Sequence, residues 1–235
     1  MAEQNLFFHY KLTLSDGKVL EFTLEIDGAT ETFIPAIDQS PPFWSQLDYQ
    51  QCENCPLSKE QSPQCPVAIN LMPLIELCSS LVSYENVKME LITSERTVSH
   101  DNTTLQRVLS SILGLIMATT ACPHTEYLKP MARFHLPLAS PEETIYRTTS
   151  MFLLAQYFRH KAGLTTTLEL DELTDIYHNL QVVNRALARR FRAAISEDAT
   201  LNAIILLDLL SQSVTWSIED GLEELRYLFK RYGVN

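Results

Sequence analysis

Glycine is scarce in this chain: there are six in 235 residues, and none falls in a G-x-G-x-x-G or G-x-x-x-x-G-K pattern. The glycine-rich turns that hold nucleotide phosphates are therefore absent. Positive charge is also in short supply, because 18 Lys and Arg residues face 29 Asp and Glu residues, for a net charge of −11. Such an acidic chain is not attracted as a whole to phosphate backbones or anionic lipids. We therefore expect neither nucleic acid nor a membrane as its partner.

The amino-terminal residues lack the basic stretch and apolar segment of a signal peptide. The longest uncharged run, residues 108–125, contains serines, threonines and a proline, so we expect a buried core helix instead of a transmembrane helix. The five cysteines are an odd number. We predict a cytoplasmic protein in which they are reduced thiols or metal ligands, and not a disulfide framework.

The first hundred residues carry two hairpin patterns. Apolar and polar residues alternate over residues 6–14 and 20–26, on either side of Asp16-Gly17, which is typical of a β-hairpin with one buried face. A second hairpin is predicted from the alternation over residues 87–91 together with residues 96–99. Between them, apolar residues at helical spacing predict a helix over residues 66–81, in which Pro73 should cause a kink. This region therefore reads ββαββ.

From residue 101 onward the sequence predicts helices. Ser140-x-x-Glu143 is a capping box that opens a helix ending at Gly163. A long amphipathic helix over residues 173–191 and two more, over 198–216 and 218–232, follow it. The first of these two is apolar nearly all round, so we expect it at the centre of the bundle. Ser110, Gly114 and Ala118 form a row of small residues that would let another helix approach closely.

These patterns predict an α+β fold, with a small antiparallel ββαββ sheet packed against a C-terminal bundle of about five helices. Residues 1–100 form an acidic β-rich region with the cysteine-containing loop, and residues 101–235 form the helical bundle. Because no flexible linker separates the two regions, they can also form one continuous domain.

Three cysteines lie in a proline-rich segment, residues 28–66, which has no periodicity and therefore needs something to hold it. Cys52 and Cys55 form a C-x2-C pair, whose thiolates can bind one metal ion from a tight turn, and Cys65 supplies a third. Cys122 or His124 would complete a tetrahedral zinc site. An iron–sulfur cluster is the alternative, and it would require Cys122 because it uses four thiolates.

Two readings without a metal remain for these cysteines. They can be unligated thiols, or Cys52 and Cys55 can form a redox pair, although no βαβ pattern surrounds them as in thioredoxin-like proteins. Cys78 lies on the apolar stripe of its predicted helix and reads as a small core residue.

The segment of residues 122–141 is expected to be a non-helical connector that carries His124, Lys129, Arg133 and His135. The two histidines could act as acid and base with Glu142 or Glu143 nearby. The interpretation we prefer is structural, with Arg133 and His135 bonded to backbone groups of a buried loop. A nucleophilic pair of Cys122 and His124 lacks an identifiable third residue.

Two further patterns have structural explanations. Arg185, Arg189 and Arg192 share one face of the long helix, beside Arg190. This face could bind a phosphate, a nucleic acid or an acidic partner, or the acidic front region of a second copy, although a solvated helix end is the simpler interpretation. Several aromatic residues of the helix that starts at residue 141 are assigned to core packing: Tyr146, Phe152, Tyr157 and Phe158.

Several motifs together resemble a family of uncharacterised bacterial proteins. They are Cys52-x2-Cys55-Pro56, Cys65-Pro66, Cys122-Pro123-His124 and Leu128-Lys-Pro-Met-Ala-Arg-Phe-His135. The resemblance covers most of the chain. It implies a bacterial, cytosolic origin for a domain of unknown function, and it implies no activity.

The sequence therefore predicts a non-catalytic cytoplasmic interaction or regulatory protein with a structural zinc site. Its partner would be another protein or a second copy of itself. No catalytic residue is assigned. One alternative is an enzyme that uses the connector from Cys122 to His135, and another is a self-assembling structural protein.

Overall fold

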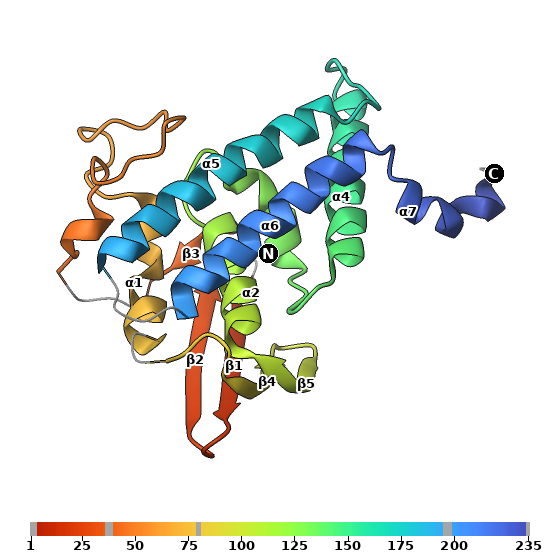
Figure 1. Ribbon diagram of the computed structural model, residues 1–235. Coiled ribbons are helices and arrows are strands. Elements are labelled where there is room, and N and C mark those ends of the chain that lie inside the picture. The colour runs from red at the N-terminus through yellow and green to blue at the C-terminus, as the bar shows by residue number, and fades with distance from the viewer. Residues whose placement is uncertain (1–3, 36–39, 79–80, 195–198, 234–235) are drawn as a thin grey trace.

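The computed structural model describes residues 4–35, 40–78, 81–194 and 199–233, and its fold is α+β, as predicted (Figure 1). The strands are β1 (Leu6–Leu14), β2 (Val19–Ile26), β3 (Phe33–Ile34), β4 (Asn86–Ile92) and β5 (Thr97–Thr104). The helices are α1 (Pro66–Cys78), α2 (Leu105–Ala118), α3 (Lys129–Arg133), α4 (Pro141–Lys161), α5 (Asp171–Ala194), α6 (Ala199–Glu219) and α7 (Glu223–Arg226). Short 3-10 helices cover Phe43–Ser45 (η1), Glu126–Leu128 (η2) and Tyr227–Tyr232 (η3).

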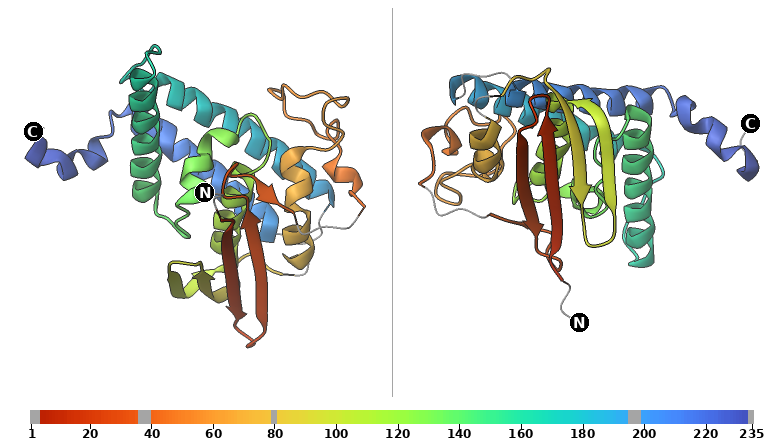
Figure 2. Two further views of the ribbon diagram at one scale, coloured as in Figure 1. Left: turned by 180° about the vertical axis from the view of Figure 1, so that it is seen from behind. Right: turned by 90° about the horizontal axis from the view of Figure 1, so that it is seen from below.

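The sheet is antiparallel throughout, with the strand order β3-β2-β1-β4-β5. The predicted first hairpin is confirmed, with Leu12 opposite Leu20. Its turn uses Gly17 at φ +86°, a conformation that a residue without Cβ adopts at no steric cost. Alternate residues of β1 are buried and face the helices, which lie behind one face of the sheet in the right view of Figure 2.

The second hairpin is also confirmed, but β5 is longer than predicted. It continues to Thr104, where a helix was expected from residue 101, because its residues keep pairing with β4 as far as Thr104 opposite Asn86. An edge strand of polar residues shows no apolar alternation, so its length was not visible in the sequence. β3, with two residues, is too short to produce a pattern. Helix α1 ends at Cys78 and contains Pro73; residues 79–80 of its predicted extension lie outside the described part.

The capping box at the start of α4 is present as predicted. The Glu143 amide donates to the Ser140 hydroxyl (3.1 Å), and the Ser140 amide donates to the Glu143 carboxylate (2.7 Å). Helix α6 begins at Ala199; Asp198, the expected start, is outside the described residues. The helix predicted over 218–232 is instead α7 and η3, separated from α6 by residues 220–222, of which Gly221 and Leu222 have positive φ. This C-terminal arm projects away from the body (Figures 1 and 2).

One main hydrophobic core joins the sheet to the helices. It contains side chains of both hairpins, α1, α2 and parts of α5 and α6, for example Tyr10, Leu71, Leu109 and Phe191. A smaller second core lies between α4, α5, the end of α6 and α7. Ten of the fourteen residues of α2 are buried, so the uncharged run that begins at residue 108 is a core helix, as predicted.

Helix α6 contacts α1, α2, α4 and α5, which agrees with a central position, but one side of it stays uncovered. Ile205, Leu209 and Trp216 are 37%, 51% and 59% exposed. By length and composition alone α6 is long and apolar enough to cross a membrane, a test that the core helix of a soluble protein also passes.

The assignment of the α4 aromatic residues to core packing is wrong for most of them. Phe152 is buried, but Tyr146, Tyr157 and Phe158 are 45%, 53% and 62% exposed. Helix α4 stands at one end of the bundle, where α5 and α6 cover one side of it and leave the other side open (Figure 1).

Candidate metal centre

The proline-rich loop around the cysteines closes on itself before it reaches α1. The Cys65 amide donates to the Ser45 carbonyl (2.8 Å), and the Leu47 amide donates to the Pro63 carbonyl (3.0 Å). Gln46 and Gln64 lie opposite each other in an isolated antiparallel β-bridge between these two hydrogen bonds. The two ends of the loop therefore run side by side, with Cys65 at its base and Cys52 and Cys55 in the intervening segment.

Arg190 of α5 holds this loop from the other side. Its side chain is 1% exposed, and its guanidinium donates to three loop carbonyls: Trp44 (2.7 Å), Gln46 (2.7 Å) and Leu47 (2.9 Å). The expectation that the loop needs something to hold it is thus met in part by a buried cation. Arg185 and Arg192 on the same helix are exposed, as expected for a solvated face.

Cys52 and Cys55 lie in a tight turn, in which the Cys55 amide donates to the Cys52 carbonyl (3.1 Å). Asn54 at the tip of this turn donates from its side-chain amide to the side-chain oxygen of Asn179 in α5 (2.8 Å). The C-x2-C turn is therefore fixed against the same helix that supplies Arg190.

The segment after α2 comes to the same place. His124 places its Nε2 atom 2.7 Å from the carbonyl oxygen of Asn54. Cys122, two residues earlier, is buried, and its carbonyl accepts the amides of Thr125 (3.1 Å) and Glu126 (3.2 Å) in a compact turn. Residues 70 positions apart in the sequence are thus brought into contact, and the two candidates for the fourth ligand arrive together.

Four of the five cysteines influence one another electrostatically. Burial, with smaller contributions from the thiols of Cys65, Cys122 and Cys55, raises the pKa of Cys52 to about 12, because a second negative charge nearby is unfavourable. Burial also raises the pKa of Cys122, with a smaller contribution from Cys65. Cys78, in contrast, has a pKa raised to about 12 by burial alone, which agrees with its assignment as a core residue.

The thiols are neighbours, but they do not meet at one point. Among the residues that the structure describes, no group of three or more His, Cys, Asp and Glu side chains has an arrangement that could hold a metal ion. Cys52, Cys55, Cys65 and Cys122 therefore form a cluster of reduced thiols here, and zinc or an iron–sulfur cluster stays a prediction.

The connector differs from the expected non-helical segment, because η2 and α3 lie within it. Arg133 donates to the backbone carbonyl of Gly28 (3.3 Å), as the structural interpretation predicts. The bond expected between His135 and backbone was wrong: its Nε2 atom lies 2.5 Å from the hydroxyl of Tyr10 in β1. Burial, with a smaller contribution from the nearby Arg147 charge, lowers the pKa of His135 to about 3.

Sequence reasoning missed two residues that position this region, Arg190 and Tyr10. A signal for Arg190 existed, since it follows Val183 by seven residues and Leu187 by three and therefore lies on the apolar stripe of its helix. A charged residue on a buried stripe indicates a buried partner. For Tyr10 the pattern gave burial, but nothing in the sequence pointed to a bond with His135.

Comparisons with known proteins give one match. Residues 8–230 match the family model described as a domain of unknown function (DUF6901). No curated protein and no solved structure matches the chain.

Proposed function

The chain belongs to the DUF6901 family of unknown function, and from this premise we propose that it is a non-catalytic interaction protein with a structural zinc site. The zinc ligands are the thiolates of Cys52, Cys55, Cys65 and Cys122. The observation that carries the metal proposal is the gathering of these four thiols from two distant segments, with Cys78 left outside.

Zinc would remove the main electrostatic cost of this cluster. Burial, and to a smaller extent the neighbouring thiols, disfavour the thiolate form of Cys52 and raise its pKa, whereas a bound divalent cation stabilises thiolates. Side-chain rotations would have to bring the four sulfurs to one point, because the described residues contain no arrangement that could hold a metal ion. A site whose ligands are all protein atoms stabilises a fold and leaves no position for a substrate.

We favour Cys122 over His124 as the fourth ligand because Cys122, unlike His124, is among the groups that raise the pKa of Cys52. The Nε2 atom of His124 already contacts the carbonyl of Asn54, so the imidazole supports the C-x2-C turn from outside. Outer-shell bonds of this kind commonly orient the ligands of a metal site.

The connector supports the enzyme alternative less well than the cysteine cluster supports a structural zinc site. His135 is bonded to Tyr10, and its lowered pKa keeps the imidazole neutral. Glu143 is used in the capping box, and Glu142 accepts a hydrogen bond from the Tyr227 hydroxyl (2.9 Å). An acid–base pair would need a carboxylate within hydrogen-bond reach of the histidine.

The interaction surface we propose is the outer face of α4, which binds a second copy of the chain. Four adjacent apolar residues of this face, Leu153, Leu154, Tyr157 and Phe158, are 37%, 55%, 53% and 62% exposed. The projecting arm carries exposed apolar side chains as well, among them Tyr227 and Tyr232. The arm of one copy can reach the α4 face of another because it extends beyond its own fold (Figure 1).

Two measurements test the proposal separately. Metal analysis of the purified protein and of a variant without one cluster thiol tests the zinc site. The solution mass of the protein and of a variant with charges on the α4 face tests the interaction.

A further inference from the structure

We infer that the helical region contains a binding site for a small amphiphile with a carboxylate head and an alkyl tail. The site is a cavity of about 510 Å³, which lies between α2, the connector, the start of α4, α5 and α6. Cavities of this size accommodate small organic ligands. This site is separate from the cysteine cluster and does not depend on the presence of zinc.

The tail part of the cavity is built by small residues facing leucines. Gly114 and Ala118 of α2 line one side, and Leu206, Leu207 and Leu210 of α6 line the other. A Cβ atom at Gly114 would lie 3.4 Å from the Leu207 Cδ2 atom, so the two helices are close at this point. The row of small residues thus lets α6 pack closely against α2, as the sequence suggested. It also leaves apolar space beside this contact.

The polar groups of the cavity favour a negative charge. Arg107 and Arg147 both line it, whereas no Asp or Glu side chain of the described residues does. The chain has a net charge of −11, whereas this cavity has two guanidinium groups and no carboxylate, so the sign of the charge in the cavity is opposite to that of the whole chain. A planar guanidinium matches a carboxylate with two parallel hydrogen bonds.

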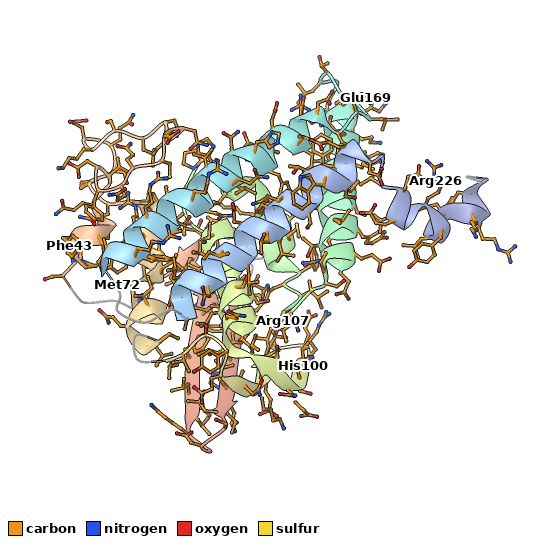
Figure 3. The ribbon with its side chains drawn as sticks, in the orientation of Figure 1. Phe43, Met72, His100, Arg107, Glu169 and Arg226 are labelled. Carbon is orange, nitrogen blue, oxygen red and sulfur yellow. The ribbon has the colours of Figure 1, made fainter. Side chains whose placement is uncertain are left out.

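Arg107 is available for such a head group. It is exposed in the first turn of α2 (Figure 3), and no hydrogen bond or ion pair involves it within the described ranges. Arg147, on the other hand, already donates to the carbonyls of Met131 (3.0 Å) and Phe134 (2.8 Å). We therefore assign the direct contact with the carboxylate to Arg107.

Ser110 gives the second indication of a ligand. Its side chain is 4% exposed, and its hydroxyl oxygen has no hydrogen-bond partner within the part of the chain that the structure describes. A buried hydroxyl without a partner is unfavourable. Because residues three apart share a helix face, Ser110 lies beside Arg107 and can bond to the same carboxylate.

The test is titration calorimetry of the intact protein with dodecanoate and with dodecanol, both below their aggregation limits. We expect one dodecanoate per chain and weaker binding of dodecanol. Arg107→Gln should weaken dodecanoate binding by about tenfold or more, the loss typical of a charge-assisted hydrogen bond. Arg96→Gln, an exposed arginine of the β4–β5 turn, is the matched control and should bind dodecanoate like the wild type.

A second variant tests the tail part of the cavity. Leu210→Trp enlarges a half-buried side chain that lines the cavity and should abolish the binding of both probes, with the helix content checked by circular dichroism. Absence of dodecanoate binding to the wild type would overturn the inference. Equal affinity for dodecanol, or unchanged affinity of Arg107→Gln for dodecanoate, would overturn the assignment of an anionic head.

Discussion

The Nε2 atom of His124 lies 2.7 Å from the carbonyl oxygen of Asn54, so the start of the connector that follows α2 is tied to the tip of the C-x2-C turn. This contact places Cys122 near Cys52 and Cys65 in space, although these cysteines lie far from Cys122 in the sequence. The contact also brings both candidates for a fourth zinc ligand, Cys122 and His124, to this turn.

The first prediction concerns His124. His124→Ala should lower the free energy of unfolding by about 0.5–1.5 kcal/mol, because the partly buried carbonyl of Asn54 loses its partner. It should keep the zinc, whereas Cys122→Ala should lose it. Urea unfolding and metal analysis of both variants measure these effects. Loss of zinc from His124→Ala, with zinc retained in Cys122→Ala, would make the imidazole the fourth ligand.

The second prediction concerns Arg190. Replacement by Met should destabilise the protein by about 2–5 kcal/mol, since three loop carbonyls lose a charged donor. Arg185→Met, on the exposed face of the same helix, is the control and should change stability by less than about 0.5 kcal/mol. Hydrogen exchange should become faster in residues 43–65 first. Equal unfolding energies of the two variants would refute the role of Arg190 as the clamp of the loop.

The third prediction concerns the pH dependence that His135 causes. Its pKa is lowered to about 3 in the folded protein, so below pH 6.5 the unfolded chain takes up a proton that the folded chain does not. The stabilising contribution of His135 is therefore present above pH 6.5 and decreases as the pH falls towards 3.

The wild type should lose stability relative to His135→Gln as the pH falls from 7.5 to 5.0, with a slope that approaches about 1.4 kcal/mol per pH unit. Denaturant unfolding at several pH values measures this difference. His100→Gln, at an exposed position of β5, controls for the exchange of a histidine for a glutamine. A difference between wild type and His135→Gln that is constant with pH would contradict the burial of a neutral imidazole.

The fourth prediction concerns self-association through α4. The double variant Leu154→Glu/Phe158→Glu should be monomeric at concentrations where the wild type is not, because it places two charges on the apolar face. Leu168→Glu is the control, since Leu168 is 83% exposed and lies outside α4. Light scattering after size-exclusion chromatography gives the mass. A monomeric wild type at high concentration would remove the self-association proposal and leave the zinc proposal untouched.

The regular elements were predictable where one physical pattern dominates. The first hairpin has strict alternation around Asp16-Gly17, and the start of α4 has a complete capping box, so both were found. The polar edge strand β5 and the two-residue strand β3 have no such pattern and were missed. The aromatic residues on the exposed face of α4 were wrongly assigned to the core. Apolar residues at helical spacing indicate a face that can be buried, but they do not show whether another part of the same chain covers it.

The candidate site was predictable only in part. Spacing alone grouped Cys52, Cys55 and Cys65, and it separated Cys78, which lies on an apolar stripe. The contacts of Arg190 with residues 44–47 and of His135 with Tyr10 join positions more than a hundred residues apart. Contacts of this kind depend on the packed tertiary structure and leave little trace in a single sequence.

The fifth and most direct test of the account is the zinc content of the protein purified without chelators, compared between Cys55→Ala and Cys78→Ala. Both variants remove one partly or fully buried thiol, but only Cys55 belongs to the cluster. We predict close to one zinc per chain in the wild type and in Cys78→Ala, and none in Cys55→Ala. A wild type without zinc, or a Cys55→Ala variant that keeps its zinc, would contradict the proposed zinc site. Iron in place of zinc, with absorption in the visible range, would show that the site holds an iron–sulfur cluster.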